Sequence, residues 1–298
     1  MPAIERMVRE RIQAIMDRIV KGFIVTLFGI ATTVLTAAGL VYMELHYDCA
    51  IYGFVYAFVL PFGAFISGVV AASGYYFGSR LLSFRPGRGV LLNMVAVSGA
   101  NFFFIYWLKY QYLTVDGEAI RKWISYPAYL TFTLSHTSVT FDQFTRDTVA
   151  LGFWGYAYAA LQIAGFAFGG YCIYNLVRSA PYCEGCGFYL KLKGKQTRYF
   201  ERVEQLADCL AEFRLTTGRG EFRKAMDEHA DAGSTMVDDA KGYSAVVEVH
   251  ECKGCGKQWF DLHAKQRVNK KWHEIAKLRY STFSTEKVDA LEEMTGAA

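Results

Sequence analysis

The sequence predicts a mainly α-helical membrane protein, in which a four-helix transmembrane bundle is joined to a small α+β cytoplasmic domain. Three observations support this fold class. Hydrophobic residues make up 53% of the 298 residues and the mean hydropathy is +0.14, a composition between those of soluble and wholly membrane-embedded proteins. Four long apolar segments occupy the first 180 residues, and two Cys-x-x-Cys-Gly motifs follow them.

The first 19 residues predict an amphipathic helix that lies on an anionic membrane surface. Apolar residues recur there at helical spacing, at Ile4, Ile12, Ile15 and Ile19, among both basic and acidic side chains. We expect this helix to lead directly into the first span.

Residues 20–178 are expected to form the transmembrane domain. Each apolar segment approaches or exceeds the roughly 20 residues that cross a bilayer as a helix. The predicted spans are residues 20–42, 51–77, 89–110 and 151–177, with an outer segment at 113–150. Pro61 is expected to kink the second span, because proline removes a backbone donor and clashes with the preceding turn.

The loop charges predict that both termini are cytoplasmic in a multi-pass topology. The positive-inside rule places arginine-bearing loops in the cytoplasm. Arginines lie between spans two and three and after span four, at Arg80, Arg85, Arg88 and Arg178, whereas the first loop has no Lys or Arg. Reduced cysteines in the last third of the chain suit the same compartment.

Small residues at four-residue spacing predict close helix packing, either within the bundle or in a homo-oligomer. The pairs are Gly74 with Gly78 and Gly165 with Gly169.

Polar residues within the spans predict hydrogen bonds between helices more readily than a transport path. They are Asn93, Ser98, Asn101 and Gln162, none of which is ionised, and Lys109 is close enough to the outer end to snorkel. Outside the spans, Glu44, His46, Asp48 and His136 could line an outer metal site, but without ligand spacing we expect a solvated rim.

Four cysteines, Cys183, Cys186, Cys252 and Cys255, predict one metal site. In each Cys-x-x-Cys-Gly motif two thiolates can face one ion, and the glycine can take a positive φ that tightens the turn. Two such turns make a closed tetrahedral site whose usual occupant is zinc. Iron bound as in rubredoxin, or a redox dithiol, remains the alternative.

The paired motifs resemble the zinc-ribbon superfamily over residues 181–268. That resemblance implies two β-hairpins that clamp one zinc ion. Residues 187–251 separate the motifs by more than the usual interval, so we expect a cytoplasmic domain at 179–298 with a helical insertion at 196–240. A helix is predicted at 198–213 with Cys209 as a buried apolar residue, and a second at 220–232.

Aromatic and basic residues after the third cysteine predict a binding surface. Its candidates are Lys257, Trp259, Lys265, Arg267, Lys270, Lys271 and Trp272. A protein partner or the anionic inner leaflet is the favoured ligand, because the domain is tethered directly after a span. Nucleic acid, bound through phosphates and stacking, is the less favoured alternative.

We expect a non-enzymatic protein. The sequence has no Walker loop, Gly-x-Ser-x-Gly elbow, His-Glu-x-x-His helix or dinucleotide fingerprint, and four thiolates leave zinc no open position. The leading hypothesis is an integral membrane protein whose zinc-stabilised cytoplasmic module docks a protein partner as a scaffold, assembly factor or regulator. The alternatives are a small channel or pore-forming effector gated by that module, and a membrane electron-transfer protein with iron in the Cys₄ site.

Overall fold

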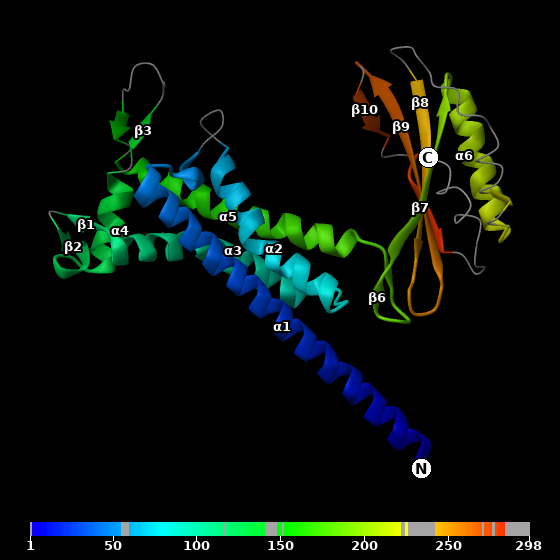
Figure 1. Cartoon of the computed structure of the whole chain (residues 1–298), viewed down its shortest axis with the longest axis horizontal. Coiled ribbons are helices and arrows are strands. Elements are labelled where there is room, and N and C mark those ends of the chain that lie inside the picture. Colours follow the sequence, from blue (N-terminus) through cyan, green and yellow to red (C-terminus); the bar gives the residue numbers. More distant parts are fainter. Residues whose placement is uncertain are drawn as a thin grey trace. The chain divides into compact units, whose positions relative to one another are not determined.

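The chain divides into a helical unit, Met1–Ala180, and a unit built around a β-sheet, Pro181–Ala298 (Figure 1). The computed structural model describes residues 2–54, 60–115, 117–136, 138–140, 148–150, 152–221, 224–225, 242–269, 271–275 and 278–283.

Four long helices form the first unit: α1 (Pro2–Tyr47), α2 (Phe62–Leu81), α3 (Arg88–Tyr112) and α5 (Trp154–Ser179). Helix α1 contacts α2 and α3, and α5 contacts the same two helices. Shorter elements connect them: η1 (Ile51–Gly53), the β1–β2 hairpin (Thr114–Val115 and Glu118–Ala119), η2 (Ile120–Lys122), α4 (Tyr126–Ser135) and the β3–β4 pair (Ser138–Thr140 and Thr148–Ala150).

Close glycine contacts define the directions of these helices. A Cβ on Gly74 of α2 would lie 2.2 Å from the Phe28 carbonyl oxygen of α1, and one on Gly78 would lie 3.4 Å from Val25 Cα, so α2 is antiparallel to α1. Gly165 and Gly169 of α5 meet, in order, Pro61 and Val69, so α5 is parallel to α2. Gly170 of α5 meets Met94 and Ser98 of α3, and Gly99 of α3 meets Ile163 and Ala167, so α3 is antiparallel to α5. Helices α1 and α3 therefore run one way, and α2 and α5 run the other.

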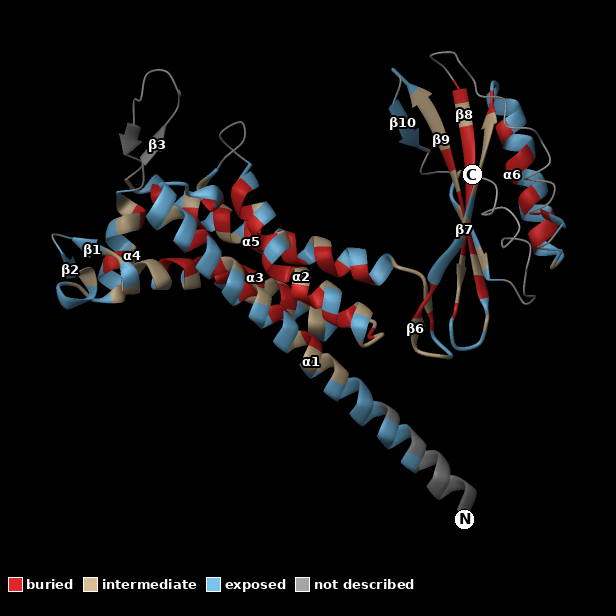
Figure 2. Ribbon diagram, viewed as in Figure 1, coloured by how far each residue is buried: buried red, intermediate tan, exposed pale blue. Residues whose placement is uncertain are grey.

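Three helical segments in the described part of the chain are long and apolar enough to cross a membrane: Arg11–Tyr47, Arg88–Tyr112 and Trp154–Ser179. Helix α2, rich in glycine, serine and tyrosine, is not among them. Half of its 20 residues are buried against neighbouring helices (Figure 2).

The N-terminal segment leads directly into the first span, and the two form one continuous helix, because residues 3–47 contain no proline to interrupt it. One expectation about helix boundaries is wrong. Pro61 does not kink a helix but precedes the first residue of α2, where its missing N–H costs nothing. Residues 55–59 of the predicted second span lie outside the described residues.

An antiparallel sheet forms the second unit. Strand β8 (Gly242–Glu251) pairs with β7 (Lys191–Phe200) and β9 (Gln258–Val268), and β9 also pairs with β10 (Lys271–Glu274) and β11 (Tyr280–Phe283). A separate short hairpin joins β5 (Tyr182–Cys183) and β6 (Phe188–Tyr189). Helix α6 (Val203–Gly218) contacts β7 and β8.

One face of the sheet forms the core of this unit. Alternate residues of the central strands pack with the apolar face of α6: Ala245, Val247, Val249, Phe260, Leu262, Ala264, Leu206, Leu210 and Phe213. Figure 2 shows this burial along β8 and on α6. Because side chains alternate along a strand, Trp259, Asp261, His263, Lys265 and Arg267 of β9 share the opposite face.

The helix expected at 198–213 begins later than its periodicity suggests. Strand β7 runs to Phe200, and α6 begins at Val203. Residues Gln196 to Phe200 pair with Val247 to Tyr243 of β8, so strand pairing outweighs local helical periodicity there. The predicted 196–240 insertion thus opens with strand, and most of its second predicted helix lies outside the described residues.

Candidate metal centre

Two equivalent turns present the four cysteines. The first, Cys183 to Gly187, connects β5 and β6, and the second, Cys252 to Gly256, connects β8 and β9. Gly187 N donates to Cys183 O at 2.8 Å, and Gly256 N donates to Cys252 O at 2.9 Å. Both closing glycines have φ of 70°, which a side chain rarely adopts, so the glycine in each motif is required by the turn.

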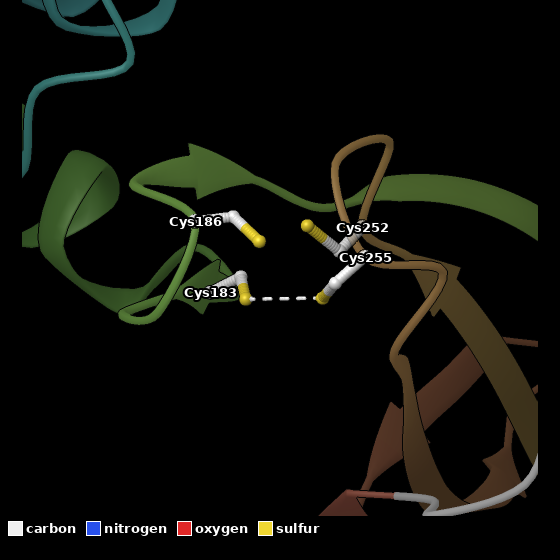
Figure 3. A group of neighbouring side chains, drawn as sticks. All are labelled: Cys183, Cys186, Cys252 and Cys255. Carbon is white, nitrogen blue, oxygen red and sulfur yellow. Dashed lines mark hydrogen bonds between the residues drawn. The ribbon is translucent and has the colours of Figure 1, made fainter.

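The four thiol sulfurs converge on one point (Figure 3). All four lie within 4.8 Å of one another, and Cys183 Sγ lies 3.8 Å from Cys255 Sγ. A tetrahedron with Zn–S bonds of about 2.3 Å has S–S edges of about 3.8 Å. None of the four is in a disulfide. The arrangement is therefore compatible with a zinc-ribbon-like site for one ion.

The two turns approach each other most closely at Gly254. A Cβ at this position would lie 3.1 Å from Cys186 Cβ and 3.2 Å from Cys186 Sγ. The equivalent glycine of the first turn, Gly185, has no atom within 4 Å of the same added Cβ. Only the second turn therefore depends on a missing side chain for the convergence of the sulfurs.

The four cysteines differ in how far they are buried. Cys183 and Cys252 are buried, Cys186 is intermediate, and Cys255 is exposed. Leu190, Phe188 and Trp259 pack around the inner pair. The site is thus dry on one side and open to solvent on the other, so a metal ion could enter from the Cys255 side.

The crowded thiols influence one another's ionisation. Hydrogen bonding with the Cys255 thiol, followed by burial, raises the pKa of Cys186 to about 12. Burial raises the pKa of Cys252, but hydrogen bonds from the backbone N–H groups of Cys255 and Gly254 outweigh it, and the pKa falls to about 7. All four thiols must lose their protons to bind a cation, so we expect binding to weaken in acid.

Lysines add positive charge beside the sulfurs. Lys253 Nζ lies 4.4 Å from the centre of the Phe188 ring, and Lys257 Nζ lies 4.8 Å from the centre of the Phe283 ring. These cation–π contacts hold two ammonium groups near the second turn. They lessen the net negative charge that four thiolates and one divalent ion would carry.

The predicted binding surface is partly assembled by the sheet. Trp259, Lys265 and Arg267 share the β9 face opposite the core, and Arg267 lies over the Trp272 ring at 6.0 Å. Lys271 neighbours Trp272 in β10, while Lys270 lies outside the described residues.

Carboxylates share that face with the basic side chains. Arg279 donates to both oxygens of buried Asp261, at 2.6 and 3.2 Å, and Lys195 pairs with Glu248 at 3.0 Å. His263 lies between Asp261 and Glu274, at 3.2 and 3.0 Å. The surface is therefore of mixed charge, and its carboxylates already pair with basic side chains of the same unit.

One ion pair in the helical unit was not predicted from the sequence. Lys109 Nζ lies 2.6 Å from Glu44 Oε1, the Tyr52 hydroxyl donates to Glu44 Oε2 at 2.8 Å, and the two charged side chains are only 14% and 19% exposed. Glu44 and Lys109 therefore pair with each other. Glu44 does not belong to a solvated rim, and the Lys109 ammonium does not extend into solvent. The sequence did contain a signal for this pair: Glu44 and Lys109 carry opposite charges, and each lies three residues before the end of its helix.

Cys209 packs in the core of the second unit, near Arg198 and away from the other cysteines. Burial is the main cause of its raised pKa. In the part of the chain that the structure describes, the His, Cys, Asp and Glu side chains gathered closely enough to hold a metal are the four predicted cysteines. Comparisons of the chain with protein-family models, with curated proteins and with solved structures find no match.

Proposed function

We propose that this chain is a non-enzymatic integral membrane protein whose zinc-stabilised cytoplasmic module docks a protein partner. The observation that carries the proposal is the convergence of four thiol sulfurs from two turns in a unit that directly follows an apolar helix. Only Ala180 and Pro181 separate α5 from β5. If α5 crosses the membrane, the metal module is held at the membrane surface, where a partner can be recruited.

Helix direction supports four crossings. Helices α1 and α3 run the same way and α2 runs against them, so a chain that crosses in both α1 and α3 must return through α2. Packing against apolar neighbours lets α2 be less apolar than a lone span. Four crossings place both termini on one side, and the arginines at Arg80, Arg85, Arg88 and Arg178 favour the cytoplasm.

Native Cys49 offers a test of this topology. It is exposed in the connection after α1, at the end of the unit opposite the arginine-bearing loops. An impermeant maleimide applied to intact cells is expected to label Cys49, and not a cysteine introduced at Arg85. Labelling of the Arg85→Cys position from outside, or equal labelling of both, would contradict the topology.

Docking is tested by crosslinking in native membranes. We expect one protein to be crosslinked to the wild-type chain and to the Cys209→Ser variant, but lost from Cys252→Ser and weakened by Arg267→Glu. Cys209 lies away from the metal centre, so its variant controls for loss of a thiol. A crosslinked set that is unchanged by both Cys252→Ser and Arg267→Glu would contradict docking through this module.

A channel remains the second candidate because of one observation. The Asn101 side chain is fully buried in α3, and both its amide oxygen and its nitrogen lack a hydrogen-bond partner. Such a group in a membrane helix commonly binds water or a neighbouring polar group. Conductance across a planar bilayer that disappears in Asn101→Leu would favour the channel over the scaffold.

A further inference from the structure

A cavity of about 700 Å³ lies between the carboxyl-terminal ends of α1 and α3 in the helical unit. Ala38, Val41 and Leu45 of α1 form one wall, and Leu108 of α3 forms part of the other. The α1 residues recur every three or four positions, so they share one face of the helix. The volume falls within the range of pockets that bind small molecules, about 300–1,000 Å³.

Polarity changes along the cavity. From Ala38 to His46 the α1 wall covers about 12 Å of helix axis at 1.5 Å per residue. The deeper part is lined by aliphatic side chains, whereas His46, Tyr112 and Thr114 bring polar atoms to the end near the last turns of the two helices. The Tyr42 and His46 rings stack with centres 4.2 Å apart, which makes this polar end aromatic.

The lining carries no Asp, Glu, Lys or Arg. The nearby Glu44 and Lys109 charges neutralise each other in an ion pair. A ligand that fits must therefore be apolar along most of its length, polar at one end, and need no net charge at that end.

We propose that this cavity holds an acyl chain of a bilayer lipid, with the chain along Ala38, Val41 and Leu45 and the headgroup beside His46 and Tyr112. Both helices that form it are apolar and long enough to cross a membrane, so their ends reach the depth where headgroups begin. At that depth tyrosine is a favoured side chain, and lipid is the apolar molecule present in excess.

The proposal rests on the membrane insertion assigned under the proposed function and is tested in vesicles. The full chain is reconstituted in phosphatidylcholine that contains a tracer with a photoactivatable diazirine in one acyl chain. We expect irradiation to crosslink lipid preferentially to residues 38–46 and 108–113, as located by peptide mass spectrometry.

Neighbouring positions on α1 supply the variant and its control. Ala38→Trp fills the cavity, so most crosslinking to residues 108–113 should be lost. Gly39→Trp adds the same side chain where nothing lies within 4 Å of the added Cβ, and should leave it unchanged. Equal effects of the two variants, or crosslinks spread evenly along the exposed surfaces of all helices, would overturn the lipid site.

Resistance to alkaline carbonate extraction shows whether a negative result contradicts the lipid site alone or the proposed function as well. A chain that stays in the membrane but lacks the localised crosslinks contradicts the lipid site and leaves the proposed function standing. A chain that carbonate extracts contradicts both.

Discussion

At the scale of single residues, the metal centre depends on a glycine that is not one of the turn-closing pair. Gly254 lets the second turn approach Cys186 to within 3.1 Å of where a Cβ would stand, whereas Gly185 faces open space. The two motifs look interchangeable in sequence, but the structure makes them unequal.

Gly254→Ala should therefore weaken metal binding and Gly185→Ala should not. A methyl group there must displace Cys186 by a few tenths of an ångström, and overpacking of this kind costs about 1–3 kcal/mol, which is about 5- to 150-fold in affinity. Competition with a chromophoric chelator measures the affinity of each purified variant. Equal affinities for the two variants would show that the turns do not approach as described.

The ion pair between Lys109 and Glu44 gives a second expectation at this scale. Lys109→Met leaves the Glu44 carboxylate mostly buried without its cation, and should destabilise the helical unit by about 3 kcal/mol. The double variant Glu44→Gln/Lys109→Met should recover part of that loss, because no lone charge remains. Thermal unfolding in detergent measures the stability of each variant. If the double variant loses as much stability as the two single substitutions added together, the two residues do not interact.

At the scale of elements, glycines set how closely the helices pack. A Cβ at Gly169 would lie 2.5 Å from Val69 N, so α5 and α2 are in backbone contact there. The predicted glycine pairs are thus occupied by contacts within one chain, and they give no separate support to a homo-oligomer.

Gly169→Leu should separate α5 from α2 and destabilise the helical unit by more than the 1–3 kcal/mol that is typical of an overpacked core. Gly39→Leu, on an open helix surface, is the matched control. Detergent unfolding and metal content are measured together. We expect Gly169→Leu to lower only the unfolding temperature; unchanged stability would contradict the contact between α5 and α2.

Individual helices and the cysteine motifs could be predicted from the sequence better than the contacts between distant parts of the chain. Hydropathy located α3 and α5 to within a few residues and found the apolar part of α1, because an apolar stretch of that length has few other stable forms. The cysteine spacing predicted the ligand set, which the sulfur positions confirm as a cluster able to bind a metal, although they do not identify the ion.

What the sequence could not supply was pairing between distant residues. Lys109 meets Glu44 across 65 positions, and the end of β7 stays extended because β8 lies beside it. The unequal roles of Gly185 and Gly254 likewise arise only when two hairpins meet. Each is a tertiary effect, absent from local periodicity or spacing.

At the scale of the whole molecule, a unit of apolar helices is followed by a unit that carries one cluster of four cysteines. The cysteine turns are separated by 72 positions between Cys183 and Cys255, so a bound ion closes a long loop and couples metal binding to folding. Loss of the ion is then expected to loosen the two cysteine turns and the strands that carry them.

Elemental analysis of zinc and iron in the purified chain decides whether the four cysteines bind one zinc ion. We expect one zinc per chain in wild type and in Cys209→Ser, and loss of zinc when any of Cys183, Cys186, Cys252 or Cys255 is replaced by serine. Iron with thiolate charge-transfer absorption would favour an electron-transfer protein instead. Absence of any stoichiometric metal in the wild-type chain, or its retention in all four serine variants, would contradict a zinc site formed by the four cysteines.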